Sequence, residues 1–414
     1  LVRSTAGLRA THSPRPPPTS TPPPVADWPN ASRPTELPLL GGRYRYMSCL
    51  GEGTCAFVFL VADTMLADTP RALKIFRSGR SDIGMQEAGI LRMLQKDTHF
   101  ENAHIAPCLG VFLHGEHVCL LLQRLYTPLE QILTAPRPPC VVRKLALQLF
   151  SCLSLLHHHG VIHGDISPSN ILATRALDPH SNSLPVKLID YSNSFPVKMA
   201  HVYWTDFDLQ TLRYRAPEVV FGVPFGVAID VWSVGCVLAE CVAGTPLFPA
   251  TDDSELVALM TDLLGNVPKE FHKGANWGRL GAHVVAPAPQ SLPAHAALHA
   301  KLSLSDPVLA DLVAGALALD PSARLTADGA LTHPALSSLN PPPWLGSSHH
   351  ARKRHYPPGT RAIRGLERLR TLVEDTNVAP TTAPPHKLVS GKRRGGPALV
   401  KVEKNAKIRR SVQR

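Results

Sequence analysis

Residues 161–172 read VIHGDISPSNIL, and residues 186–192, further along the chain, read VKLIDYS. Asp165 and Asn170 in the first stretch are five residues apart, so both side chains of one loop can face the same reaction centre. Asp190 in the second stretch directly follows an apolar run that is typical of a strand. A carboxylate can accept a hydroxyl proton, while an amide oxygen and a second carboxylate are ligands that suit Mg²⁺ bound to phosphates. The two stretches predict Asp165 as a base and Asn170 and Asp190 as metal ligands.

A glycine-rich stretch upstream indicates where phosphate groups would be covered. Residues 51–58 read GEGTCAFV and lie between two strand-like stretches, so a hairpin containing Gly51, Glu52 and Gly53 could close over phosphates. Alone this signal is weak. A dinucleotide-binding fold would place such glycines between a strand and a helix, and no helix is predicted after them.

Lys74 gives the glycine-rich stretch a chemical partner. It lies sixteen residues beyond Val58, within the apolar stretch ALKIF, and a helix is predicted soon after it. A lysine buried beside a nucleotide needs a carboxylate that keeps it charged and oriented, and Glu87 on that helix can supply one. Lys74 and Glu87 are therefore predicted to form an ion pair at the phosphates.

The composition describes a chain that can bury a core but also carries stretches that cannot fold. Forty prolines accompany 44% hydrophobic and 18% charged residues among 414. No apolar run approaches roughly 18 residues, so no membrane span is expected. The eight cysteines are scattered without a CxxC pair, which favours a reduced intracellular protein, nuclear or cytoplasmic or both.

The net charge of +11 is concentrated at one end of the chain. Residues 341–414 hold 17 lysines and arginines against four acidic residues, or +13, which leaves about −2 for residues 1–340. A central nucleic-acid-binding fold would carry its own basic face, so no dedicated nucleic-acid-binding domain is expected. The basic clusters at 352–354, 392–394 and 404–410 suit nuclear import or binding to an anionic partner. The alternative is a tail that only keeps the chain soluble.

Hydrophobic patterning predicts a small β-rich lobe followed by a larger helical one, an α+β class. Strand-like stretches begin at residue 42 and include 58–62 and 72–76, and a helix is predicted over 86–94. Further helices are predicted beyond about residue 128, at 141–157, 229–242, 255–264 and 307–319.

Proline-rich stretches bound the predicted folded region. Residues 1–40 hold ten prolines and are predicted to be a disordered leader, with a ligand for proline-reading domains as the alternative. Ordered structure is predicted to stop around residues 340–343, so residues 337–414 form a basic, largely disordered tail. Within it, residues 361–375 have near-helical apolar spacing, which fits either an exposed nascent helix or a docking segment.

Across roughly residues 44–335 the sequence resembles the eukaryotic protein kinase family. The motifs that carry the resemblance fall in the family's order: the glycine-rich stretch, Lys74, Glu87, His163-x-Asp165 with Asn170, Asp190, and Ala216-Pro217-Glu218. Residues 209–219, 228–236 and 244–249 are similar to the CMGC group. Gly164 and the run at 190–194 are most similar to its dual-specificity tyrosine-regulated and homeodomain-interacting kinases.

The resemblance implies a fold, an activity and further site residues. The fold would be the two-lobed protein-kinase fold over residues 41–336, with lobes dividing near 125. The activity would be transfer of phosphate from ATP, with Mg²⁺, to serine or threonine of protein substrates, often before proline, with dual specificity left open. Val58, Ala72 and Leu172 would sandwich adenine, and Gln123 to Leu125, behind Leu122, would form the hinge. The implied scaffold contacts are a stack of Leu91, His163 and Tyr191, an ion pair of Glu218 with Arg324, and Asp230 bracing the catalytic loop.

Three departures from the family bear on activity. Ala56 replaces the third glycine, which should be mild. Ser192 stands where the metal-binding loop normally has glycine, and Ser167 stands where a lysine normally approaches the transferred phosphoryl group. Charge stabilisation is the main contribution of such a site, so the expectation is a slow enzyme at worst, and not necessarily an inactive one. The alternative is an inactive pseudokinase that acts as a nucleotide-binding scaffold.

Regulation also departs from the family. Gly164 replaces the arginine that would grip an activation-loop phosphate, and Asp208 stands where the resembled kinases have a tyrosine. We hypothesise that the Asp208 carboxylate partly substitutes for a phosphotyrosine by pairing with Arg213 or Arg215. The alternative is a solvated acidic loop.

Overall fold

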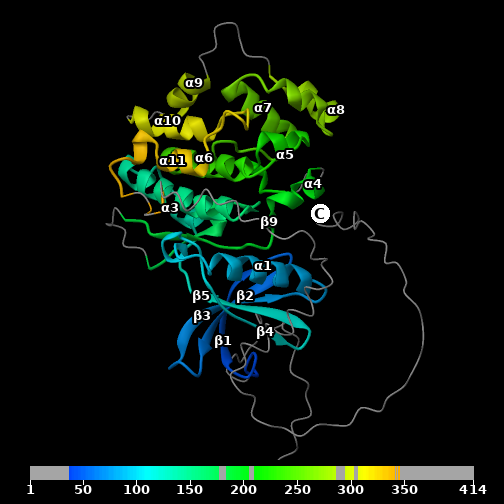
Figure 1. The fold of residues 1–414 in the computed structure, drawn as a ribbon, viewed down its shortest axis with the longest axis vertical. Coiled ribbons are helices and arrows are strands. Elements are labelled where there is room, and N and C mark those ends of the chain that lie inside the picture. The colour runs from blue at the N-terminus through cyan, green and yellow to red at the C-terminus, as the bar shows by residue number, and fades with distance from the viewer. Residues whose placement is uncertain are drawn as a thin grey trace, which may run out of the picture.

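The computed structural model describes residues 37–176, 183–204, 209–285, 294–302, 306–340, 342 and 344–345 (Figure 1). The N-terminal lobe is a five-stranded antiparallel sheet in the order β1-β2-β3-β5-β4. Its strands are β1 (Tyr44–Glu52), β2 (Ala56–Asp63), β3 (Thr69–Phe76), β4 (Cys108–His114) and β5 (His117–Gln123). The helix α1 (Ser81–Leu94) packs against β3, β4 and β5.

The C-terminal lobe is mainly helical and is built around α3 (Pro139–His158) and α6 (Ala228–Ala243), which pack against each other. The other helices of the described part are α2 (Leu129–Ile132), α4 (Ala200–Tyr203), α5 (Pro217–Phe221), α7 (Asp253–Leu264), α8 (Trp277–Leu280), α9 (Ala294–Leu302), α10 (Pro307–Ala316) and α11 (Ala327–Leu331). Figure 1 shows these green and yellow helices on one side of the blue and cyan sheet. The predicted α+β class with two lobes is confirmed.

Within the described residues, α3 alone is long and apolar enough, by length and composition, to cross a membrane. Most of the helix is buried inside the C-terminal lobe. Core helices of globular proteins pass the same test, so α3 is read here as a core helix.

Four short strands carry the loops between the lobes. β6 (Val161–Ile162) pairs with β9 (Phe195–Pro196), and β7 (Ile171–Ala173) pairs with β8 (Val186–Leu188), both antiparallel. The loop after β6 runs to Asn170, and the loop after β8 begins at Ile189. The two pairs of strands therefore bring the two stretches quoted from the sequence side by side.

Two helices differ in length from their predictions for identifiable reasons. Helix α1 begins at Ser81, five residues before the predicted start at 86. The prediction left out residues 81–85 because they lack the apolar spacing of the later turns. Gly84 looks like a helix breaker, yet a Cβ there would lie 2.6 Å from the ring of the buried Phe76, so this turn requires a glycine. Helix α10 ends at Ala316, before Leu319.

Three consecutive histidines at the end of α3 each lie beside an aspartate from a different part of the chain. The pairs are His157 Nε2 with Asp230 Oδ2 at 3.2 Å, His158 Nδ1 with Asp328 Oδ2 at 3.8 Å, and His159 Nε2 with Asp97 Oδ2 at 2.9 Å. These aspartates belong to α6, to α11 and to the segment after α1. The end of α3 thus connects three regions.

Trp344 extends the ordered structure past the predicted end at residues 340–343. Its side chain is 1% exposed. Its ring lies 5.0 Å from that of His99, centroid to centroid, and its indole N–H donates to Ser154 Oγ at 3.4 Å. His99 follows α1 and Ser154 belongs to α3, so Trp344 packs against both lobes.

Candidate active site

The β7–β8 hairpin brings Asn170 and Asp190 together. Ile171 pairs with Leu188, and the next backbone bond along the hairpin runs from Ile189 N to Asn170 O at 2.9 Å. Asp165 lies on the loop that leads into this hairpin, and the Asn170 side-chain amide donates to the Asp165 carbonyl at 2.8 Å. The three residues predicted from the sequence therefore lie in one site.

The Asp165 carboxylate accepts hydrogen bonds from three side chains. Its Oδ1 accepts from the backbone N–H of Thr211 at 3.2 Å and from the Thr211 hydroxyl at 2.7 Å. Its Oδ2 accepts from the side-chain amides of Asn170 at 3.4 Å and Asn193 at 3.3 Å. Thr211 and Asn193 were not predicted as site residues, although both lie in stretches that resemble CMGC kinases, residues 209–219 and 190–194.

Lys74 joins the two lobes through two carboxylates. Its Nζ lies 2.7 Å from Glu87 Oε2 and 2.7 Å from Asp190 Oδ1. Burial opposes the charge on Lys74, but the attraction of Glu87 and Asp190 is stronger in sum, so the pKa of Lys74 is raised. The predicted pair with Glu87 is confirmed, and Asp190 is a second partner that the sequence did not reveal.

Asp190 is held in a tight turn with φ of 63°. Its Oδ1 also accepts from the hydroxyl of Ser192 at 2.6 Å and from the Ser192 backbone N–H at 3.2 Å. Burial would raise the pKa of Asp190, but the charge of Lys74 and the bonds from Lys74 and Ser192 lower it to about 2. Ser192 therefore fixes the Asp190 carboxylate in addition to replacing a flexible glycine.

The remaining oxygens suit a divalent cation. The bonds at Asp190 all reach Oδ1, and Asn170 uses its Nδ2, so Asp190 Oδ2 and Asn170 Oδ1 have no protein donor among the described residues. One carboxylate oxygen and one amide oxygen are a donor set from which Mg²⁺ takes the remainder of its shell as water and phosphate oxygens. The residues present fit the predicted ion.

The predicted nucleotide-binding residues of the N-terminal lobe lie on β1, β2 and β3. Val58 pairs with Lys74 across β2 and β3, and Ala72 is two residues before Lys74, so all three side chains are on one face of the sheet. The turn between β1 and β2 closes with a bond from Gly53 N to Ala56 O at 2.9 Å. Gly51 and Gly53 belong to this hairpin, whereas the Glu52 carboxylate pairs with Arg77 at 2.6 Å.

The predicted hinge begins at Gln123, the last residue of β5. Leu125 is buried, and the Gln123 side-chain carbonyl accepts from Lys187 Nζ at 3.0 Å. Tyr126 N donates to Ala173 O at 2.8 Å, which ties the hinge to β7, the strand that carries Leu172. This bond therefore holds the end of the hinge beside the strand of the C-terminal lobe that carries Leu172.

Of the scaffold contacts implied by the resemblance, the structure shows the Glu218–Arg324 ion pair, the bracing by Asp230 and the contact of His163 with Tyr191. Arg324 Nη1 and Nη2 lie 2.6 and 2.9 Å from the Glu218 carboxylate oxygens, with both side chains fully buried. Asp230 accepts from the backbone N–H groups of His163 at 2.8 Å and Gly164 at 3.0 Å. The rings of His163 and Tyr191 are 4.9 Å apart.

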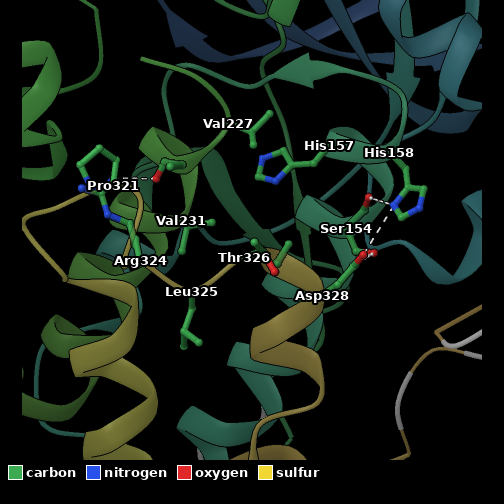
Figure 2. A pocket seen from close by; sticks show the side chains of 12 residues that line it. Ser154, His157, His158, Val227, Val231, Pro321, Arg324, Leu325, Thr326 and Asp328 are labelled. Atoms are coloured by element: carbon green, nitrogen blue, oxygen red, sulfur yellow. Dashed lines mark hydrogen bonds and ion pairs between the residues drawn. The ribbon is translucent and has the colours of Figure 1, made fainter. Parts of the chain in front are cut away.

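One cavity adjoins the catalytic loop, and another lies within the C-terminal lobe. One of about 370 Å³ is lined by Ser167, Ser169, Thr211, Arg213 and others, and opens beside Asp165. The other, of about 340 Å³, lies among α3, α6 and α11, and Figure 2 shows His157 and Val227 at one side of it and Thr326 and Asp328 at the other. The first cavity adjoins the predicted base through Thr211, which lines the cavity and donates to Asp165.

The Asp208 hypothesis falls on residues outside those that the structure describes. One of its two suggested partners is already engaged. Arg215 donates to Asp253 Oδ1 at 2.9 Å and to the carbonyls of Leu209 and Gln210 at 2.9 Å each. Arg213 is exposed.

Comparison with known proteins places this geometry among kinases. A family model described as a protein kinase domain matches residues 44–336. Rat dual specificity tyrosine-phosphorylation-regulated kinase 3 is 31% identical over 359 residues, covering 79% of this chain and 59% of the relative. Arabidopsis serine/threonine-protein kinase AFC3 is 30% identical over 337 residues, covering 72% of this chain and 82% of the relative. Homeodomain-interacting protein kinase 1 of Caenorhabditis elegans is 31% identical over 242 residues, covering 57% and 28%.

A solved kinase-domain crystal structure has the same fold. It superposes with a TM-score of 0.61 at 24% identity and covers 72% of this chain and 96% of its own. The chain spans about three fifths of the rat relative's length.

Proposed function

The chain belongs to the protein kinase family, and from that membership we propose that it transfers the γ-phosphate of ATP to serine or threonine hydroxyls of protein substrates. The observation that carries the proposal is the ion-paired Lys74, 2.7 Å from both Glu87 and Asp190, in the same site as Asp165 and Asn170. A purely scaffolding domain has no need of this buried charged set, whose desolvation is costly.

Each of these residues has a defined task in the proposed reaction. Asp165 accepts the proton of the substrate hydroxyl as its oxygen attacks the γ-phosphorus, and the bond from that phosphorus to ADP breaks. Lys74 binds the α- and β-phosphates as a fixed cation. Asn170 and Asp190 would hold Mg²⁺, which neutralises developing negative charge on the phosphates when it is bound.

Loss of the base tests the proposal. We expect wild type to phosphorylate a serine-containing peptide with ATP and Mg²⁺, and Asp165→Asn to reduce kcat by about 10²–10⁴-fold. The melting temperature of both proteins, with and without ATP, shows whether the variant folds and binds nucleotide. If both are silent while ATP raises the melting temperature, the protein is a nucleotide-binding pseudokinase and the proposal is wrong.

The finer substrate class is also part of the proposal. We propose a preference for serine or threonine followed by proline, supported by similarity to CMGC relatives. Paired Ser-Pro and Ser-Ala peptides of otherwise identical sequence test it, and equal kcat/KM values would rule it out. Tyrosine peptides in the same assay decide dual specificity.

Nuclear import through the basic tail is a separate proposal. It is supported by the 17 lysines and arginines of residues 341–414. Replacing the clusters at 352–354, 392–394 and 404–410 by glutamine should shift a fluorescently tagged chain from nucleus to cytoplasm. An unchanged distribution would contradict this role.

A further inference from the structure

The hydrogen bonds that hold the Asp165 carboxylate all come from uncharged groups. Thr211 supplies two donors to Oδ1, and the amides of Asn170 and Asn193 face Oδ2. Among the described residues, no lysine or arginine pairs with this carboxylate. The base is therefore oriented without a neighbouring cation.

Ser167 does not take over the orientation of Asp165. Its side chain is buried, and its hydroxyl shares a hydrogen bond of 2.8 Å with the Ser169 hydroxyl. The hydroxyl groups of Ser167 and Ser169 therefore hydrogen-bond to each other and not to Asp165. Within this loop only the Asn170 amide reaches Oδ2, at 3.4 Å, and the second donor to Oδ2 comes from another segment.

The absence of a side chain at Gly164 lets that segment approach. Gly164 has φ of 76°, and a Cβ there would lie 2.9 Å from the backbone oxygen of Asn193. A larger residue would push the loop after Asp190 outward. Since Gly164 adjoins Asp165, the same approach brings the Asn193 amide to Asp165 Oδ2.

The neighbour of Asn193 is fixed from two sides. The Ser194 hydroxyl donates to His163 O at 3.0 Å, and Ser194 O accepts from the Gln86 amide at 2.6 Å. The Asn193 backbone is thus anchored to the catalytic loop and to α1, while its side chain remains exposed and reaches Asp165.

We propose that Asn193 is a positioning residue for the base, and that its amide does for the orientation of Asp165 what a cation at position 167 would otherwise do. The proposal rests on the proposed kinase function. Thr211 holds one carboxylate oxygen, and Asn193 together with Asn170 holds the other, so rotation of the carboxylate is restricted from both sides. Because the Asn193 amide carries no charge, it orients the base without stabilising the transferred phosphoryl group.

A double-mutant cycle tests this role, because coupled residues depart from additivity. The proteins are wild type, Asn193→Ala, Ser167→Lys and the double variant. Asn193→Ala should lower kcat by about two- to tenfold, the range for loss of one neutral hydrogen bond, and leave the KM for ATP unchanged. With lysine at 167, which enters the cavity beside Thr211, the same substitution should cost less than twofold.

The matched control is Asn102→Ala, the same chemical change at an exposed position of the N-terminal lobe, which should leave kcat unchanged. An Asn193→Ala variant with wild-type kcat would overturn the proposal. So would an equal loss in the serine and lysine backgrounds, because Asn193 would then act independently of position 167.

Crystal structures of wild type and Asn193→Ala test whether Asn193 positions Asp165 without any measurement of enzyme activity. We expect a single Asp165 side-chain rotamer in wild type and a rotated or divided one in the variant. An unchanged rotamer overturns the positioning role, whereas a wild type without phosphate transfer overturns the proposed function and leaves this structural comparison valid.

Discussion

At the scale of single residues, the folded protein stabilises the charged form of the Asp190 carboxylate. Its pKa is lowered from 3.8 to about 2 by Lys74 and Ser192, so the unfolded chain takes up this proton more readily as the pH falls. The stability that Asp190 contributes is complete above pH 3.8 and is lost as the pH falls toward 2.

We therefore expect Asp190→Asn to weaken the pH dependence of unfolding between pH 4 and 2. The difference from wild type should be about 1–2 kcal/mol, allowing for solvent screening because the side chain is 38% exposed. Denaturant unfolding across this pH range measures it. Asp262→Asn, on an exposed position of α7, is the control for removing a carboxylate, and identical pH slopes for Asp190→Asn and wild type would contradict the prediction.

Residues in local motifs could be predicted from the sequence, and residues that meet through the fold could not. Asp165 and Asn170 share one loop, and Lys74 with Glu87 is separated by a single turn and part of a helix. Thr211 and Asn193 reach Asp165 from 46 and 28 residues away. Nothing in their local sequence specifies that approach, which depends on β9 pairing with β6 and on Gly164 having no side chain.

At the scale of elements, α1 contains two glycines with opposite roles. Gly84 is buried against Phe76, where a Cβ would come within 2.6 Å of the ring, whereas a Cβ at the exposed Gly89 would meet nothing within 4 Å. The intrinsic preference for alanine over glycine inside a helix is about 1 kcal/mol at both positions.

Gly89→Ala should raise the free energy of unfolding by about 0.5–1 kcal/mol. Gly84→Ala should lower it by about 1–3 kcal/mol, because overpacking outweighs the gain in helix propensity. Gly84→Ala should also reduce phosphate transfer, since Glu87 lies on the next turn of α1 and would move with it. Thermal unfolding and peptide assays of both variants check this, and stabilisation by both would show that Phe76 can move aside.

Most elements could be predicted because burial gives them periodic apolar residues. Helices α3 and α6 were predicted to within two residues at each end. The start of α1 was missed because Gly84 is there for packing against Phe76, a requirement that helix propensity does not register.

At the scale of the whole molecule, Trp344 contacts both lobes from beyond the last helix that the structure describes. A proline-rich flank indicated that order ends before it, but a buried indole outweighs that local signal. Its contacts with His99 and Ser154 reach both lobes, so the folded unit includes residues that composition alone assigns to the tail.

Trp344→Ala should lower the free energy of unfolding by about 3–5 kcal/mol, the usual cost of truncating a large buried aromatic residue. Trp344→Phe, which keeps the ring but not the N–H, should cost clearly less. Urea unfolding of both variants and of a chain ending at residue 340 measures this. A chain ending at 340 that is as stable as wild type would show that Trp344 does not contribute.

The two histidines that end α3 and the one directly after it constrain how that helix can change. Consecutive residues of a helix project about 100° apart, so His157 and His158 point in different directions, and His159 follows as the helix ends; the three reach aspartates in three separate regions. One inserted or deleted residue upstream in α3 would turn all three side chains together and separate every pair at once, including the one at Asp230. The helix can therefore accept substitutions, but a change in its length would displace His157 from Asp230, the residue that binds the backbone of the catalytic loop.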